Sequence, residues 1–145
     1  MFQTGENAAI NPRNMPNIRF EINPNKTGCT STYTTMVWNP PAAPVTNRWS
    51  GYLDATTTGD WYFTGMAGTC TGCNMITTCT FTAAKASLND GAPTPIIYSV
   101  AVGKGRDSLW VGAVDGLRIN NTVSDFEPTG VVEHHGCGGG GEHNC

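Results

Sequence analysis

Charge is the scarcest property of this chain. Asp, Glu, Lys and Arg make up 13% of the 145 residues, roughly half the share found in typical soluble proteins. The eight Lys and Arg residues stand singly along the chain, and the formal net charge is −3. Recognition of nucleic acid requires a basic patch or stripe that neutralises phosphates. We therefore expect no nucleic-acid partner.

The chain also lacks a long apolar run and the common catalytic motifs. No stretch of the sequence approaches the ~20 apolar residues of a membrane-spanning helix, so we expect no membrane span. It contains no G-x-S-x-G or H-E-x-x-H motif and no phosphate-binding loop. Histidine is confined to residues 134–143, so a Ser-His or Cys-His pair would have to recruit its base from the tail. A binding or structural module is therefore more strongly indicated than an enzyme.

Residues that form turns and β-structure are abundant instead. The sequence holds 18 Gly and 9 Pro, many Thr, and short apolar runs, which is typical of an all-β domain with many turns. Four Trp, four Tyr and five Phe supply enough apolar surface for a core. The length suits one domain. We expect an antiparallel β-sandwich of the jelly-roll type with one short helix.

Alternation of apolar and polar residues predicts where the strands lie. The clearest case is Ile18–Ile22, where Ile18, Phe20 and Ile22 share one face. Segment 95–102 is apolar on both faces and predicts a central, covered strand. Residues 80–91 predict the helix, which begins after Thr80 and ends at Gly91. Further strands are expected at 32–38, at 49–55 and 60–64 as one hairpin, and within 109–131 as a closing hairpin that turns at Asn120-Asn121-Thr122.

The same pattern divides the chain into three parts. Residues 1–17 contain Gly, Pro and Asn without apolar periodicity and predict a loose N-terminal arm. Residues 18–131 form the predicted sandwich domain. Residues 132–145 form a tail rich in Gly, His and Cys.

Six cysteines are many for a cytosolic protein and ordinary for an extracellular one. The N-terminal residues have neither the basic region nor the apolar core of an export signal. Either the sequence is a piece of a longer secreted protein or the cysteines bind metal, and we favour the former. The chain is thus expected outside the cell or at its surface.

Three cysteines, Cys70, Cys73 and Cys79, lie close together in the loop expected before the helix. We predict a Cys73–Cys79 disulfide, because it would fasten the loop to the start of the helix. Six cysteines allow 15 connectivities, so this pairing is a preference. A redox role for the C-x-x-C motif is less favoured, because no strand leads into a helix that begins at the motif.

The tail gathers all three histidines and two further cysteines. Imidazole and thiolate together suit zinc or copper, so one hypothesis is a metal site. A Cys137–Cys145 disulfide or a disordered glycine-rich end explains the same residues and is favoured. The candidate ligands are His134, His135, Cys137, His143 and Cys145.

A group of aromatic and acidic residues could bind carbohydrate. Sugar rings stack on exposed aromatic faces, and carboxylates accept bonds from sugar hydroxyls. The alternative is that these aromatic residues fill the core, as Trp61 and Phe63 on one face suggest. The candidate ligand-binding residues are Trp49, Tyr52, Asp54, Asp60 and Tyr62.

The carboxylates leave two further hypotheses open. A retaining glycosidase needs two carboxyls about 5 Å apart, and calcium takes several oxygens of mixed origin. Asp115 and Asp125 are more simply explained as acceptors for backbone N–H groups at the hairpin ends. The remaining candidates are Asp54, Asp60 and Glu127.

A set of short motifs, in this order, gives the chain a resemblance to known proteins. The motifs are Tyr33–Pro40, Trp49 with Asp54, Gly59–Tyr62, Cys79–Phe81, Val100–Gly105, Ala113–Leu117 and Asp125–Glu127. Over residues 15–131 the chain resembles a largely uncharacterised group of secreted bacterial surface modules that look like concanavalin A-like or laminin G-like jelly rolls. The resemblance implies a location and an architecture, and no reaction.

The chain departs from that group at both ends. Such modules usually have strands before the one that matches Ile18–Ile22, so opening strands of the sandwich are expected to be missing. A missing strand would leave an open sheet edge that invites pairing with another copy. The group also lacks the Cys- and His-bearing tail.

The sequence thus predicts a non-catalytic extracellular binding or structural module that attaches to a polysaccharide or another cell-surface component. One alternative is a small hydrolase that uses carboxylates or a metal such as zinc or calcium. Another is a self-assembling subunit that pairs through an open edge.

Overall fold

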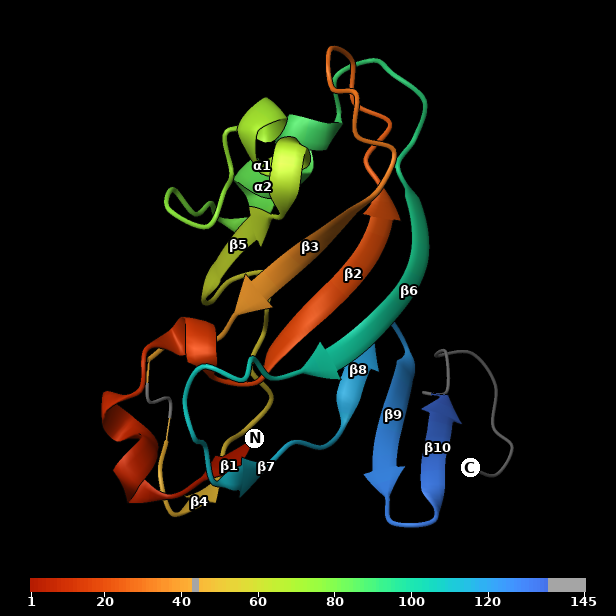
Figure 1. Cartoon of the computed structure of the whole chain (residues 1–145). Coiled ribbons are helices and arrows are strands. Elements are labelled where there is room, and N and C mark those ends of the chain that lie inside the picture. Colours follow the sequence, from red (N-terminus) through yellow and green to blue (C-terminus); the bar gives the residue numbers. More distant parts are fainter. Residues whose placement is uncertain (43–44, 136–145) are drawn as a thin grey trace.

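A computed structural model describes residues 1–42 and 45–135 (Figure 1). Within these ranges the chain is mostly β, with three antiparallel sheets and two α-helices. The sheets have the strand orders β5-β3-β2-β6, β4-β1-β7 and β10-β9-β8. The elements are β1 (Phe2–Gln3), η1 (Gly5–Ala9), η2 (Pro12–Asn14), β2 (Asn17–Asn23), β3 (Thr34–Asn39), β4 (Arg48–Trp49), β5 (Asp60–Phe63), α1 (Gly65–Thr71), α2 (Phe81–Leu88), β6 (Ile96–Gly103), β7 (Gly112–Ala113), β8 (Leu117–Ile119), β9 (Thr122–Glu127) and β10 (Gly130–His135). The predicted antiparallel β-structure is confirmed, whereas the jelly-roll topology stays a prediction.

The four-stranded sheet carries the core on one face. The alternation predicted for β2 is confirmed, since Ile18, Phe20 and Ile22 all pack against the core. Trp38 of β3 lies opposite Trp61 of β5 in the strand register. Helices α1 and α2 pack at the β5 side of the sheet and close this part of the core (Figure 1). The buried core residues are Ile22, Met36, Trp38, Trp61, Phe63, Ala67, Cys73 and Ala84.

Helix α2 confirms the predicted helix, and its start follows from its sequence. The Thr80 hydroxyl accepts a hydrogen bond from the Ala83 N–H, which caps the first turn. Ala84 is fully buried, and Phe81 and Leu88 pack beside it on the same side. The helix ends at Leu88 with Asn89 as its C-cap, earlier than predicted, and Gly91 takes its φ of +82° in the turn that follows.

The prediction of a loop before this helix is wrong, because Gly65–Thr71 form α1. Gly and Thr are poor helix formers, so packing rather than intrinsic propensity decides this segment. Ala67 and Gly68 are buried, and a side chain at Gly68 would collide with the Phe63 carbonyl. Only a helix with small residues on this face can approach β5 so closely.

Two expected strand arrangements are also wrong. Segments 49–55 and 60–64 do not form one hairpin, because β4 pairs with β1 and β5 pairs with β3. Segment 95–102 is not a central strand, because β6 lies at the end of its sheet and pairs only with β2 among the described strands. Its apolar side chains Ile96, Ile97, Tyr98 and Val100 are exposed, so the strand is not covered either.

The chain ends differ from the predicted arm and tail. Residues 1–17 are not loose, since β1 joins β4 and β7, and Gln3, Asn7 and Met15 are buried. At the other end, β10 pairs with β9 and extends to His135, so the sheet continues past Val131. The predicted turn at Asn120-Asn121 is confirmed, with Asn120 at φ +53° between β8 and β9. The rest of the tail lies outside the described residues.

Two disulfides fasten the helices to the sheet region. Cys73 and Cys79 are bonded, which confirms the predicted pair, and Cys29 is bonded to Cys70. Both cysteines of the C-x-x-C motif are thus used in separate bonds. This pairing is compatible with an oxidising compartment. Cys137 and Cys145 lie outside the described residues.

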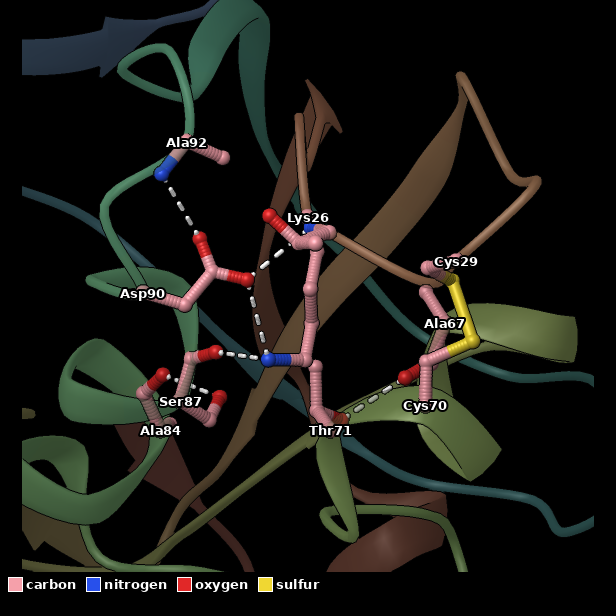
Figure 2. A network of polar contacts seen from close by, with 10 residues as sticks. Lys26, Cys29, Ala67, Cys70, Thr71, Ala84, Ser87, Asp90 and Ala92 are labelled. Carbon is pink, nitrogen blue, oxygen red and sulfur yellow. Dashed lines mark hydrogen bonds and ion pairs between the residues drawn. A yellow bond between two sulfur atoms is a disulfide. The ribbon is translucent and has the colours of Figure 1, made fainter.

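Polar contacts support the Cys29–Cys70 bond (Figure 2). The Lys26 ammonium donates to the Ser87 carbonyl at 2.8 Å and lies 3.3 Å from the Asp90 carboxylate. A cation at the C-terminal end of α2 complements the helix dipole. Asp90 also accepts the N–H groups of Thr27 and Ala92. Residues 26–29 are therefore held to the end of α2 by the contacts of Lys26 and to α1 by the Cys29–Cys70 disulfide.

The two disulfides should contribute unequally to stability. The Cys29–Cys70 bond closes a sequence separation of 41 residues and the Cys73–Cys79 bond one of 6. Loop-closure entropy then predicts that the free energy of unfolding falls by about 4 kcal/mol in the double variant Cys29→Ser/Cys70→Ser. In Cys73→Ser/Cys79→Ser it should fall by about 2 kcal/mol. Urea unfolding of the three proteins measures both values. A larger loss for the shorter loop would contradict this order.

Candidate functional site

A groove of about 890 Å³ lies beside the four-stranded sheet. Its floor is the core face of the four-stranded sheet, with Ile18, Phe20, Trp38 and Trp61. Residues 49–56 form one wall and residues 114–120 form the other. This volume lies within the range of small-molecule binding clefts.

Two indole groups hold the first wall against the floor. The Trp38 Nε1–H donates to the Thr58 carbonyl, and the Trp61 Nε1–H donates to the Ala55 carbonyl, both at 2.7 Å. These rings are almost fully buried, so both donors need a partner inside the protein. Gly59, at φ +67°, lies so close to the Trp38 indole that a Cβ would collide with it. The loop therefore follows the sheet closely.

Asp54 shapes the turn within this wall. Its carboxylate accepts hydrogen bonds from the Thr56 N–H and hydroxyl, and its backbone carbonyl accepts the Thr58 N–H. The bonds from Thr56 hold the pKa of the Asp54 carboxyl below its ordinary value. Asp54 is thus a charged, oriented acceptor at the groove.

Two aromatic side chains of the same wall remain accessible. Trp49 is 54% exposed and packs its ring against Phe2, with centroids 6.0 Å apart. Tyr52 is 69% exposed, and an added Cβ at Gly116 would lie 3.1 Å from its hydroxyl. Tyr52 therefore reaches the opposite wall. Both rings combine an apolar face with a free polar tip.

The opposite wall is tied together by Asp115. Its carboxylate accepts the backbone N–H groups of Phe126 at 2.9 Å and Gly116 at 2.7 Å. These two bonds hold the pKa of Asp115 below its ordinary value. A hydrogen bond with Asp115, with burial and the charge of Asp115 adding to it, raises the pKa of Asp125. The structural role predicted for Asp115 is confirmed by these bonds.

The structure brings together only part of the predicted carbohydrate site. Trp49, Tyr52 and Asp54 line the groove. Tyr62 does not, because β5 turns Trp61 and Phe63 toward the core and Tyr62 to the other face. Asp60 is exposed at the start of β5 and also lies outside the groove lining. The second wall was not predicted from the sequence. The Asp115-Gly116 pair, which is typical of a turn, was the one pattern that marked this segment.

The predicted metal ligands fall mostly outside the described residues, where Cys137, His143 and Cys145 lie. His134 and His135 are neighbours on β10, so their side chains point to opposite faces. His134 lies 3.8 Å from the Asp125 carboxylate, and His135 is hydrogen-bonded to the Thr122 hydroxyl. Residues 1–42 and 45–135 hold no group of three or more His, Cys, Asp or Glu that could hold a metal ion.

Comparison with protein-family models, curated proteins and solved structures found no match to this chain. No helix in the described part of the chain is long and apolar enough to cross a membrane.

Proposed function

We propose that the chain is an extracellular binding module of the concanavalin A-like type, and that its groove holds a polysaccharide chain of a cell surface. The observation that carries this proposal is the pair of exposed rings, Trp49 and Tyr52, on a wall that the buried indoles of Trp38 and Trp61 hold in place.

The groove has the mixture of surfaces that a sugar chain requires. Apolar C–H faces of sugar rings pack on aromatic side chains, and their hydroxyls need hydrogen-bond partners. Asp54 offers an ionised acceptor on one wall, and Arg118 offers donors on the other. Because the wall is preorganised, a ligand would lose little affinity to ordering of the protein.

A binding role fits the groove better than the alternative of a carboxylate-dependent hydrolase. A glycosidase acid must hold its proton at neutral pH, which requires a raised pKa. The two carboxylates that line the groove, Asp54 and Asp115, both have lowered pKa values and both accept structural hydrogen bonds. Asp125, whose pKa is raised, is not among the groove-lining residues.

The exposed rings give the first test. Trp49→Ala and Tyr52→Ala should each weaken binding to a recognised polysaccharide about tenfold, because each removes a stacking surface. Affinity electrophoresis in gels that contain β-glucan, xylan, chitin or peptidoglycan fragments measures the effect. Tyr33→Ala is the matched control, since Tyr33 is equally exposed and lies outside the groove lining. Retardation in none of these gels, or equal retardation of all four proteins, would contradict the proposal.

The free edge of β6 favours a second candidate, self-assembly with another copy of the chain. An edge strand with apolar side chains exposed along it is a template for strand pairing. Ile97 is 64% exposed and Val100 is 37% exposed on this edge. Ile96 and Tyr98 of the same strand are exposed as well.

Edge pairing predicts a dimer that a charge on β6 abolishes. Ile97→Lys and Val100→Lys should each yield a monomer, because pairing would place an ammonium group against a second copy. Sedimentation velocity across a hundredfold concentration range measures this. Val131→Lys, which places the charge on β10 instead, should leave the dimer intact. A wild-type protein that is monomeric throughout, or a dimer that survives both β6 variants, would rule out this assembly.

A further inference from the structure

A second pocket of about 270 Å³ lies at the four-stranded sheet and shares only Asn17 with the groove lining. The alternation of β2 separates the two sites, because Ile18 and Phe20 face the groove while Arg19, between them, lines the second pocket. Tyr62, which sequence reasoning assigned to the carbohydrate site, lines this pocket instead. Its polar lining also includes Arg13 and three asparagines.

Arg19 is held in a fixed orientation. Its Nε–H donates to the Asn17 side-chain oxygen at 2.7 Å, and Asn17 is buried. Gly103 of β6 lies opposite Asn17 in the register. A Cβ at Gly103 would be 3.1 Å from the guanidinium carbon of Arg19, so glycine leaves the space in which the guanidinium lies. The guanidinium is therefore positioned by Asn17 of β2 and by the space that Gly103 leaves in β6.

Arg13 approaches from the N-terminal segment, which is folded rather than loose. The Asn11 side chain accepts the Arg13 backbone N–H and caps the short helix η2. Met15, which follows this helix, is fully buried and anchors it. Arg13 therefore projects from a fixed turn.

The positive charges of Arg13 and Arg19 both act on Tyr62. The side chain is 7% exposed, and burial raises the pKa of its hydroxyl while the charges of Arg19 and Arg13 oppose that rise. Neither guanidinium has a carboxylate within ion-pair distance among the residues that the structure describes. The lining holds one carboxylate, Asp107, against two guanidinium groups. Two like charges at one pocket favour an anion that offsets their repulsion.

We propose that this pocket binds one oxyanion group, a carboxylate or a sulfate, between Arg13 and Arg19, with the Tyr62 hydroxyl as a further donor. Guanidinium groups bind such oxygens with paired, charge-assisted hydrogen bonds. The volume accommodates a single anionic group with a few waters, and the negative Asp107 disfavours a larger polyanion. The site is independent of the groove, and its test does not depend on the proposed polysaccharide.

The test is titration of the full chain with sodium sulfate and, separately, with sodium acetate, while NaCl keeps the ionic strength constant. Binding is followed by ¹H–¹⁵N NMR of the backbone and arginine Nε–H signals. At least one of the two anions should give saturable shifts at Arg13, Arg19 and Gly103. Arg13→Gln and Arg19→Gln should each weaken that binding about tenfold, because each removes a charge-assisted hydrogen bond. Arg48→Gln, an exposed arginine outside the pocket lining, should leave the affinity unchanged.

Sulfate binding alone assigns the pocket to a tetrahedral anion, acetate binding alone assigns it to a carboxylate, and either result supports the proposal. Absence of saturable shifts with both anions would overturn it, as would equal affinity in the wild type and both pocket variants. Arg13 is exposed and its side chain is not part of the core, so Arg13→Gln keeps the test decisive if Arg19→Gln fails to fold.

Discussion

One pair of hydrogen bonds determines how the groove is built. Trp38 and Trp61 lie opposite each other on neighbouring strands, and their indole N–H groups donate to the Thr58 and Ala55 carbonyls. A buried indole without an acceptor would cost about 1–3 kcal/mol, so each ring holds the loop 54–58 to the sheet. The wall that carries Trp49 and Tyr52 is continuous with that loop. The buried rings thus hold one end of this wall, and the pairing of Trp49 with Phe2 of β1 holds the other.

Because side chains alternate along a β-strand, the two faces of the four-stranded sheet have different surfaces. Neighbouring residues of β2 point to opposite faces, so Ile18 belongs to the apolar floor of the groove and Arg19 to the basic pocket. β5 repeats this division with Trp61 and Tyr62. A chain with few charges can in this way gather two guanidinium groups at one place without disturbing its core. The two proposed sites accordingly differ in chemistry, although Asn17 lines both.

Features set by neighbours in sequence were predictable, and those set by neighbours in space were not. The faces of β2, the capped helix α2 and the Cys73–Cys79 bond all follow from short-range patterns. Segment 49–55 reads as a strand, yet the Ala55 carbonyl accepts a bond from Trp61 instead of a ladder partner. The apolar pattern of β6 normally indicates a covered strand, and only the tertiary arrangement leaves it at an edge. Only one wall of the groove contains residues of the predicted carbohydrate site, because the second wall comes from residues more than fifty positions away.

Solvent exchange of the four indole N–H groups tests most directly whether the buried rings hold the groove wall. In ¹⁵N-labelled protein, the Trp38 and Trp61 signals should exchange with solvent far more slowly than the signal of Trp49, which is exposed. Replacing Gly59, which lies against the Trp38 ring, should accelerate exchange at Trp38. Exchange at Trp38 and Trp61 as fast as at Trp49 would mean that the loop is not anchored, and it would contradict the account of the groove.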